Sequence, residues 1–441
     1  MTKADLFPRL PGPFRSLAVT LLGMKVDRRR AGAAYHAARK VVDAAGANEV
    51  ARTAWRVERE ARVLARYAAL TGQAGVRLED LPFESKADLR ARVERMRCAG
   101  QLKGTIEWST GGTTGSPIDV PVTPAEDVLN TALANRLILE LCMAMPTPAR
   151  TAYLTGKVLI PADRRRPPFW VPDFRGSRRY YSMFHILAEC VPEYAQDLAR
   201  FSPDLIILNP VPAARLARFL IGMGWTLPVP PRGIWSMAEQ LLAADREAIE
   251  AAFGCRVTDT YGMTEMAILA AECRFGTLHV CDLYGRTETI PAAGGLRELV
   301  GTSYVRTQVP VVRYRTGDLC DALEPTECRC GLPGSEIRNL RGRAVEVVEL
   351  PDGRILTASP LADVLRRVPG MVWSRFEILA PDRWRLRYHA AVPSDDVVLA
   401  EVRRELARRA EGVRVEALWD PSPIPPPGKA RLVVHLGGGG R

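Results

Sequence analysis

The chain has no apolar run long enough to cross a membrane. The longest such run near the N-terminus extends from Ser16 to Met24, whereas a bilayer requires about 20 apolar residues. Asp27 and three arginines follow this run in place of a signal-peptidase site, so we expect no secretion signal. Cysteine is scarce, and the nine cysteines are odd in number, which excludes a disulfide framework and favours a reducing compartment. These absences predict a cytoplasmic protein.

Positive charge is in excess, because 61 Lys and Arg residues stand against 50 Asp and Glu residues and leave a net charge of +11. Such an excess suits nucleic acid, an anionic membrane or acidic small ligands such as nucleotides. The sequence contains no RNP, helix-turn-helix or basic-helix motif and no internal repeat. We therefore expect small anionic ligands, with no nucleic acid and no membrane as partner. The oligomeric state stays open, a homodimer included.

Length and composition predict two globular domains of unequal size, since 441 residues exceed a single domain of roughly 100–200 residues. Helical spacing covers 32–72, and Ser85 is a candidate N-cap for the next helix. From about 126 to 330 short apolar runs alternate with helices, of which two are expected at 212–222 and 238–253. This alternation predicts an α/β fold with mainly parallel sheets flanked by helices.

The composition changes after residue 342. Strands are expected at 372–379 and 383–389, and helices at 361–367 and 396–410, which together predict a small α+β unit. We therefore divide the chain into a large N-terminal domain, 1–342, and a small C-terminal domain, 343–441.

A loop rich in glycine and hydroxyl groups, from Trp108 to Pro117, lies between two strand-like segments. Glycine lets the backbone approach a ligand closely, and hydroxyl groups donate to phosphate oxygens. A Walker A loop needs a lysine after its last glycine, where this chain has Ser116, so a P-loop NTPase is excluded. The alternative is an ordinary polar hairpin turn, although a turn requires fewer small residues.

Three further motifs follow this loop along the chain: Asp259 to Glu265 (DTYGMTE), Tyr314 to Leu319 (YRTGDL) and Pro427 to Arg431 (PGKAR). Each is weak alone. Together, and in this order, they resemble the adenylate-forming superfamily of acyl-CoA synthetases, and more narrowly its phenylacetate–CoA ligase-like branch. The resemblance extends over most of the chain from about residue 81.

The resemblance implies a two-step reaction, in which ATP and a carboxylate give an acyl-adenylate and pyrophosphate, and a nucleophile then displaces AMP. Because two anions meet in the first step, the site needs positive charge and hydrogen-bond donors. The implied catalytic residues are Thr264 at the α-phosphate, Glu265 as a Mg²⁺ ligand, and Lys429, which the small domain brings to the reacting groups. The implied ATP and AMP site consists of Ser109, Thr110, Gly111, Gly112, Thr113, Thr114, Gly115 and Ser116 for the phosphates, Tyr261 at the adenine with Gly262 beside it in the sequence, and Asp318 and Arg343 at the ribose.

Three cysteines and a histidine form a candidate metal site: Cys273 with His279, and Cys328 with Cys330. Three thiolates and one imidazole can close a tetrahedral structural Zn²⁺ site. The alternative is four unrelated residues, because nine cysteines make close pairs easy to find. Some members of the branch look similar at these positions, which favours structural zinc. Cys281 and Cys320 are substitute ligands.

The sequence departs from the family at the hinge, where Val345 replaces the usual aspartate. Because the adenylation motifs are retained, we still expect acyl-adenylate formation. The hinge affects the second half-reaction, so the acceptor of the acyl group is CoA, an amine or a carrier-protein thiol. The aromatic residues within 168–190 suggest either a pocket wall for an aryl carboxylate or ordinary core packing. We thus expect a ligase for an aromatic or similar small carboxylic acid. An amide synthetase is the second reading, and a non-catalytic zinc-bearing scaffold or basic nucleic-acid-binding protein the most distant one.

Overall fold

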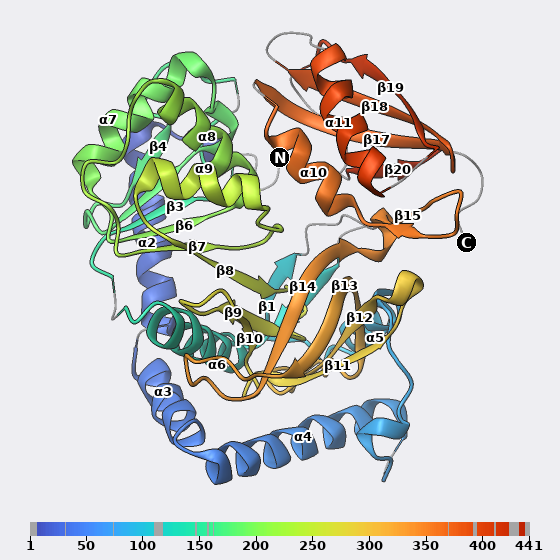
Figure 1. Ribbon diagram of the computed structural model, residues 1–441. Helices are drawn as coiled ribbons and strands as arrows, with labels where there is room; N and C mark the ends of the chain where they lie inside the picture. The colour runs from blue at the N-terminus through green and yellow to red at the C-terminus, as the bar shows by residue number, and fades with distance from the viewer. Residues whose placement is uncertain are drawn as a thin grey trace.

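The computed structural model describes residues 7–30, 32–73, 75–109, 118–145, 148–156, 158–161, 163–368, 370–390, 395–409, 412–422 and 432–436. Within these residues one large sheet of twelve strands extends through the molecule (Figure 1). Its strands in chain order are β3 (Thr151–Leu154), β4 (Trp170–Pro172), β5 (Arg178–Tyr181), β6 (Leu205–Leu208), β7 (Gly233–Ser236), β8 (Val257–Gly262), β9 (Leu269–Glu272), β10 (Leu278–Val280), β11 (Gly285–Pro291), β12 (Arg297–Ser303), β13 (Tyr314–Pro325) and β14 (Ser335–Arg343).

The strands lie in the order β11-β12-β13-β14-β10-β9-β8-β7-β6-β3-β5-β4. Within this twelve-stranded sheet, parallel pairing is confined to β3, β5, β6, β7 and β8. Every neighbouring pair from β8 to β11 is antiparallel, as is β4 with β5. The α/β class is confirmed, but the expectation of mainly parallel strands holds for only one half of the sheet. The strands after β8 follow one another without intervening α-helices, and such connections join antiparallel neighbours.

Helices cover the parallel half, as predicted from the alternating pattern (Figure 1). They are α7 (Val191–Phe201), α8 (Pro210–Gly222) and α9 (Ala243–Phe253), and α6 (Pro124–Ala134) continues into the π-helical segment η3 (Asn135–Cys142) beside β8 and β9. Proline at the first helical positions suits α7 and α8, because its missing N–H would be unpaired there anyway. α9 begins later than the predicted residue 238, since Ala238 has a positive φ of 73° that a right-handed helix cannot include.

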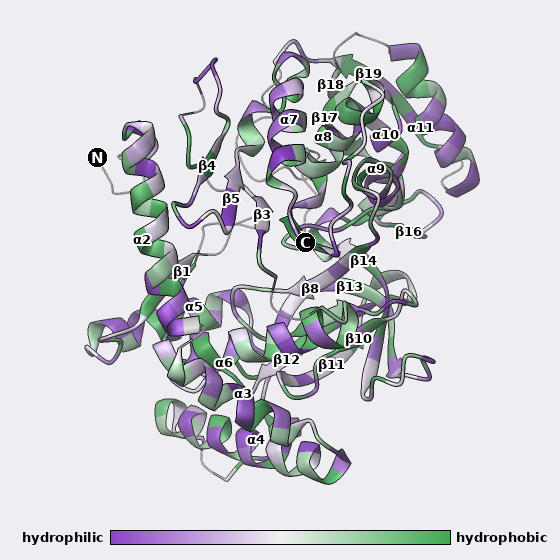
Figure 2. Ribbon diagram, turned by 90° about the vertical axis from the view of Figure 1, so that its left-hand side faces the viewer, coloured by the Kyte–Doolittle hydropathy of each residue, from purple (hydrophilic) through white to green (hydrophobic). Residues whose placement is uncertain are grey.

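The N-terminal region consists of helices: η1 (Phe7–Arg9), α2 (Gly12–Arg30), α3 (Ala33–Ala45), α4 (Glu49–Thr71), η2 (Leu78–Asp80) and α5 (Lys86–Cys98). The single helix predicted over 32–72 is therefore wrong. It is interrupted at Gly46, and Asn48 caps the second part by accepting a hydrogen bond from the Ala51 N–H at 2.9 Å. The predicted cap at Ser85 is confirmed as a reciprocal capping box with Asp88. α2 follows one edge of the molecule (Figure 2).

A smaller C-terminal domain follows β14, with elements close to those predicted (Figure 1). Its strands β17 (Met371–Ala380), β18 (Arg383–Ala390), β19 (Arg414–Trp419) and β20 (Val433–His435) form one sheet, and α10 (Ala358–Arg366), α11 (Asp395–Arg409) and the hairpin of β15 (Val348–Glu349) and β16 (Ile355–Leu356) accompany it. Alternate residues of β18, such as Trp384 and Leu386, point into a separate apolar core. A division into two moving units at 342 and 343 stays a prediction.

No helix among the described residues is long and apolar enough to span a bilayer.

Candidate functional site

The motif from Asp259 to Glu265 lies where the two halves of the sheet meet. β8 carries its first residues, pairs in parallel with β7 on one side, and pairs antiparallel with β9 on the other. Gly262 ends the strand, and Thr264 and Glu265 lie in the turn that follows. Ligand sites in α/β sheets form at the carboxyl ends of strands where the strand order changes, which makes this turn the natural place for one.

The predicted adenosine-binding residues converge at this point. The Tyr261 hydroxyl donates to Asp318 Oδ2 at 2.8 Å, and the Arg343 guanidinium lies 3.4 Å from Asp318 Oδ1. Asp318 and Arg343 are direct partners across β13 and β14, so the antiparallel register fixes their pairing. Burial raises the pKa of Asp318, while Arg343 acts in the opposite direction. Three residues far apart in the sequence thus form one polar cluster.

Glu265 joins this cluster through Tyr314, which was not among the site residues predicted from the sequence. The Tyr314 hydroxyl donates to Glu265 Oε1 at 3.1 Å, and both side chains are buried. Tyr314 is the first residue of the YRTGDL motif, and this position is the feature of the sequence that could have identified it as a site residue. The contact fixes one oxygen of Glu265 and ties the turn after β8 to β13.

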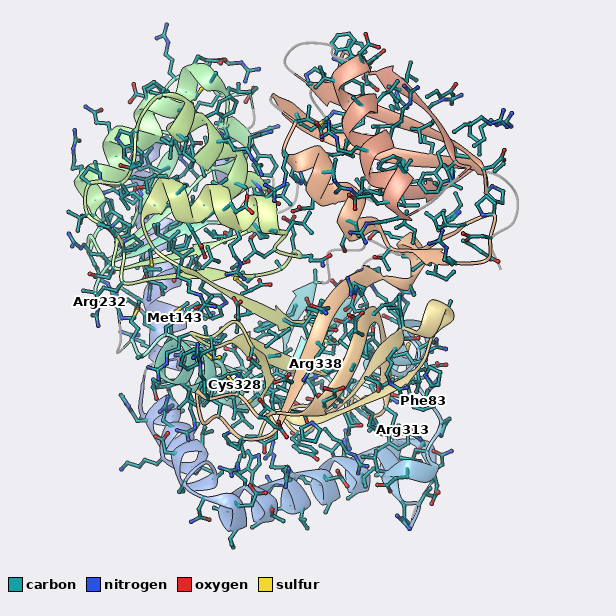
Figure 3. All side chains as sticks on the ribbon, in the orientation of Figure 1. Phe83, Met143, Arg232, Arg313, Cys328 and Arg338 are labelled. Atoms are coloured by element: carbon teal, nitrogen blue, oxygen red, sulfur yellow. The ribbon has the colours of Figure 1, made fainter. Side chains whose placement is uncertain are left out.

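The segment before α5 supports the same strand. Glu84 forms a parallel bridge with Tyr314, accepts from both η nitrogens of Arg92, and is almost fully buried. Arg313 donates to the Leu81 carbonyl at 2.7 Å, and its guanidinium lies 4.0 Å from the Phe83 ring centre (Figure 3). These contacts hold the segment before α5 against β13, the strand that carries the YRTGDL motif.

The loop rich in glycine and hydroxyl groups connects the two predicted strands, β1 (Ile106–Ser109) and β2 (Asp119–Val122). They pair antiparallel, and the Ser109 hydroxyl donates to Asp119 Oδ1 at 2.5 Å. Lys429 lies outside the described residues, and so do the loop positions Thr110, Gly111, Gly112, Thr113, Thr114, Gly115 and Ser116. The roles of these residues stay predictions.

A buried ion pair connects this hairpin to the strand that carries Asp318. Arg306 is fully buried, lies 3.6 Å from Glu126, and donates to the Pro121 carbonyl of β2 at 2.7 Å. Glu126 in turn accepts from the N–H groups of Thr307 and Gln308 at 2.6 and 2.7 Å. The base of the hairpin is therefore held against the segment that leads into β13, a link that no sequence motif indicates.

The four predicted metal ligands come together. One ligand atom each from Cys273, His279, Cys328 and Cys330 lies within 4.8 Å of the others. The Cys273 and Cys328 sulfurs are 3.6 Å apart, close to the roughly 3.8 Å that two thiolates would have around a tetrahedral Zn²⁺ with 2.3 Å bonds. Cys330 Sγ lies 3.1 Å from His279 Nε2. Cys281 and Cys320, the substitute ligands, are buried outside this group.

Hydrogen bonding favours the thiolate form at Cys328, whereas burial raises the pKa of the neighbouring Cys330 to about 11. Burial opposes ionisation of Cys328, but hydrogen bonds from Thr277 and from the Cys330 backbone lower its pKa.

The cluster connects the loop after β13 to the hairpin of β9 and β10 (Figure 3). Asp318 is near the start of β13 and Cys328 follows its end, so at about 3.3 Å per residue the two are separated by roughly 25–30 Å. A metal here would hold the far end of the two strands that carry Asp318 and Arg343. Its position suits a structural role and excludes contact with the Asp318 cluster.

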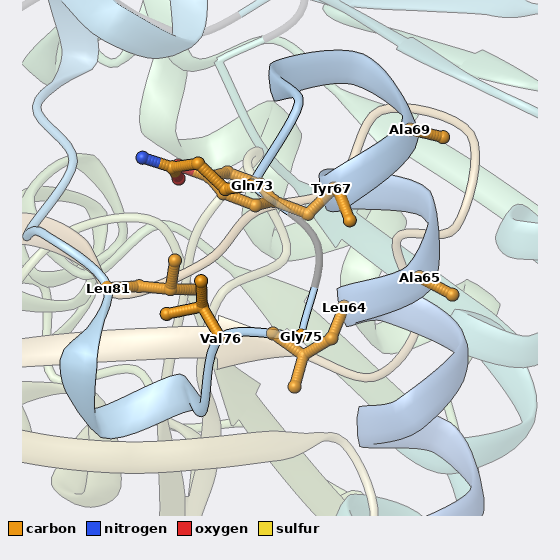
Figure 4. A pocket seen from close by; sticks show the side chains of 9 residues that line it. Leu64, Ala65, Tyr67, Ala69, Gln73, Gly75, Val76 and Leu81 are labelled. Carbon is orange, nitrogen blue, oxygen red and sulfur yellow. The ribbon is translucent and has the colours of Figure 1, made fainter.

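Two cavities lie outside the polar cluster. One of about 540 Å³ lies between the end of α4 and the segment before α5, lined by Leu64, Tyr67 and Leu81 among others (Figure 4). None of the predicted site residues that the structure describes lines it. The other, of about 460 Å³, lies between Gln240 and the strands β9, β10 and β14. Of the motif residues that the structure describes, Asp259 alone lines it.

The aromatic residues between 168 and 190 divide between core and surface. Phe169 and Tyr181 are buried in the core under α7 and α8, where their rings lie beside Tyr194. Phe174 and Phe184 are exposed. Core packing, the ordinary reading, is thus confirmed for the buried rings, which lend no support to an aryl pocket.

Asp259 provides a pH-dependent prediction. Burial raises its pKa to about 7, against an ordinary value near 4. The folded protein therefore holds a proton that the unfolded chain has lost, and its stability falls as the pH rises from about 4 to 7. An Asp259→Asn variant avoids this loss, so in thermal melts its advantage over the wild type should grow over that range to about 1–3 kcal/mol.

Asp382 provides the control of opposite sign. The hydrogen bond from Arg414, at 2.8 Å, lowers the pKa of Asp382, so this carboxylate contributes stability above its unfolded pKa. Asp382→Asn should accordingly be slightly less stable than the wild type at pH 8. An Asp259→Asn advantage that is equal at pH 4 and pH 8 would contradict the assignment.

The fold is that of the adenylate-forming CoA ligases. A solved structure of 2-hydroxyisobutyryl-CoA ligase, in the postadenylation state in complex with R3-HIB-AMP, aligns with a TM-score of 0.57 at 18% identity, over 80% of each chain. Anthranilate CoA ligase AuaEII in complex with anthranoyl-AMP aligns with a TM-score of 0.50 at 14% identity, over 74% of this chain and 64% of that one. The fold implied by the motif resemblance is confirmed.

Among curated proteins, the chain is similar to the protein CapK of Staphylococcus aureus. The two are 24% identical over 291 residues, which cover 66% of this chain and 64% of CapK. The match therefore spans less than two thirds of that relative. No family model matches the sequence.

Proposed function

We propose that the protein is an AMP-forming ligase that activates a small carboxylic acid as its acyl-adenylate and then transfers the acyl group to CoA. The observation that carries the proposal is the cluster of Tyr261, Asp318 and Arg343, with Glu265 attached through Tyr314, at the turn after β8. A diol such as the ribose of ATP matches a carboxylate flanked by a guanidinium, and the fold belongs to ligases whose solved complexes contain acyl-AMP.

In this proposal the residues of the chain bind and orient the reactants. Asp318 accepts from the ribose hydroxyls, with Tyr261 and Arg343 fixing its orientation, and Thr264 donates to the α-phosphate. Lys429 adds a compact positive charge where carboxylate and α-phosphate meet. The buried Glu265 carboxylate suits a Mg²⁺ ion, which when bound would neutralise phosphate charge. The thiol and imidazole cluster at Cys273 suits a structural Zn²⁺.

The acceptor is the finer part of the proposal. Val345, at the position of the family's hinge aspartate, lies in the 3-10 turn η7 (Ala344–Glu346) and is 44% exposed. Because this departure affects the hinge that precedes the second half-reaction, an amine acceptor is the second candidate and a carrier-protein thiol the third.

Pyrophosphate release with a panel of carboxylic acids, aromatic ones included, tests the proposal. We expect release with at least one acid, and AMP turnover that increases when CoA is added. Turnover that increases with amines and not with CoA would identify an amide synthetase. No carboxylate-dependent release from any acid would contradict the ligase and favour a non-catalytic scaffold.

Lys429→Ala should reduce carboxylate-dependent pyrophosphate release about 10²- to 10³-fold, since it removes a charge needed most in the transition state. Lys40→Ala, which removes an exposed lysine of α3, is the matched control and should behave as the wild type. Unchanged release in Lys429→Ala would remove that residue from the mechanism.

A further inference from the structure

Helix α2 buries its polar side. Ser16 and Thr20 are buried, and the Thr20 hydroxyl accepts from the Phe174 N–H at 2.8 Å. Arg15 is also buried and donates to the Pro8 carbonyl at 3.1 Å. Asp27, the one acidic residue of the helix, pairs with Arg178 of β5 at 2.5 Å and with Arg175 at 2.9 Å. Val19 is the apolar exception, because it is buried in a cluster with Ile160 and Val171. The helix contacts α6 and β4, and its larger apolar side chains are left exposed.

The outer side of α2 carries a row of large apolar side chains. Phe14, Leu17 and Leu21 are 59%, 42% and 56% exposed, and their spacing of three and four places them on one face. Leu22 and the adjoining Phe174 are exposed beside them. The helix lies along an edge of the molecule (Figure 2). Single exposed apolar residues are common, but a continuous row of them marks an interaction surface.

Cationic residues continue this row and extend beside it. Lys25 and Arg28 follow Leu21 at spacings of four and three on the same face, and both are exposed. Towards the other end of the helix, the segment that precedes Arg164 packs against α2, because Ile160 shares an apolar cluster with Val19. Burial, and then the charge of Arg164, lower the pKa of Arg15 there. Arg166, which follows Arg164 closely, is exposed. The apolar face is thus flanked by positive charge at both ends.

We propose that the outer face of α2 docks on an anionic membrane surface, with the helix lying in the interface plane. Apolar side chains would enter the boundary of the acyl chains, and Lys25 and Arg28 would contact acidic headgroups. A second copy of the chain fits less well, because the outer face of α2 offers no carboxylate to pair with those cations. No membrane partner was predicted from the sequence, because the apolar run is too short to span a bilayer and the positive charge was assigned to small anionic ligands. The structure reveals which residues of that run are exposed.

Co-sedimentation of the full chain with lipid vesicles tests the proposal. At low salt the protein should bind vesicles of phosphatidylcholine with one third phosphatidylglycerol, and bind phosphatidylcholine alone much less. The double variant Leu17→Glu/Leu21→Glu should weaken binding at least about tenfold. Lys25→Glu/Arg28→Glu should remove the preference for anionic vesicles, and added salt should do the same in the wild type.

Val50→Glu/Val57→Glu is the matched control, because it introduces the same charges at exposed apolar positions of another helix, α4. It should bind as the wild type, and circular dichroism and melting temperature should show all three variants folded. The proposal is overturned if the wild type fails to bind anionic vesicles, if Leu17→Glu/Leu21→Glu binds like the wild type, or if the control loses binding equally. A dimer that Leu17→Glu/Leu21→Glu converts to monomers, without vesicle binding, would assign the face to a second copy.

Discussion

Asp318→Asn should lower the apparent second-order rate of pyrophosphate release with respect to ATP by about a hundredfold. The substitution keeps the shape of the side chain, and its carbonyl oxygen can still accept from the Tyr261 hydroxyl. It removes the negative charge that pairs with Arg343. It also replaces a carboxylate, whose two oxygens would accept from both hydroxyls of a ribose, by an amide with one acceptor oxygen. Hydrogen bonds to charged groups contribute about 1.5–3 kcal/mol each, which corresponds to roughly 10- to 150-fold.

Initial rates over a range of ATP concentrations, at saturating carboxylate, measure this effect. Because the ribose contacts bind ground state and transition state alike, we expect most of the loss in KM for ATP. Asp321→Asn is the matched control, since Asp321 also lies on β13 and pairs with an arginine of β14, Arg341, at 2.5–2.6 Å. A KM for ATP that changes equally in both variants would mean that Asp318 supports the strand pair and does not bind the nucleotide.

Motif order identified the polar cluster because each motif carries its functional residue within a few positions. Tyr261, Asp318 and Arg343 were therefore predicted together, and the β13–β14 register places two of them opposite each other. The Tyr314–Glu265 contact was not predicted, because it depends on a pairing between distant strands. The Arg306–Glu126 pair was missed for the same reason.

The fold was predictable where local pattern decides it. Caps such as Ser85, and the alternation of buried residues along β18, depend on a few neighbouring residues. Sheet direction after β8 was predicted wrongly, because short apolar runs look alike in parallel and antiparallel strands. The break at Gly46 and the outward apolar face of α2 depend on what each helix packs against, and hydropathy along one segment does not contain that information.

Loss of the Zn²⁺ ion proposed at the Cys273 cluster should destabilise the large domain strongly while leaving nucleotide binding in place. Zinc analysis should find about one ion per chain, and Cys328→Ser should remove it, because a structural site needs its four ligands. Binding energy at such a site is folding energy, so we expect a loss of at least about 3 kcal/mol and a melting temperature lower by about 5–10 °C.

Cys255→Ser is the control, because Cys255 is partly buried but lies outside the ligand group. It should keep both zinc and melting temperature. Below its melting temperature Cys328→Ser should retain the wild-type KM for ATP, since roughly 25–30 Å of β13 separate Cys328 from Asp318. A wild type that is purified without metal and melts at the same temperature with and without added Zn²⁺ would show three thiols and an imidazole that pack without an ion. A zinc-free variant that melts normally yet releases no pyrophosphate would instead place the metal in the reaction, against the separation along β13.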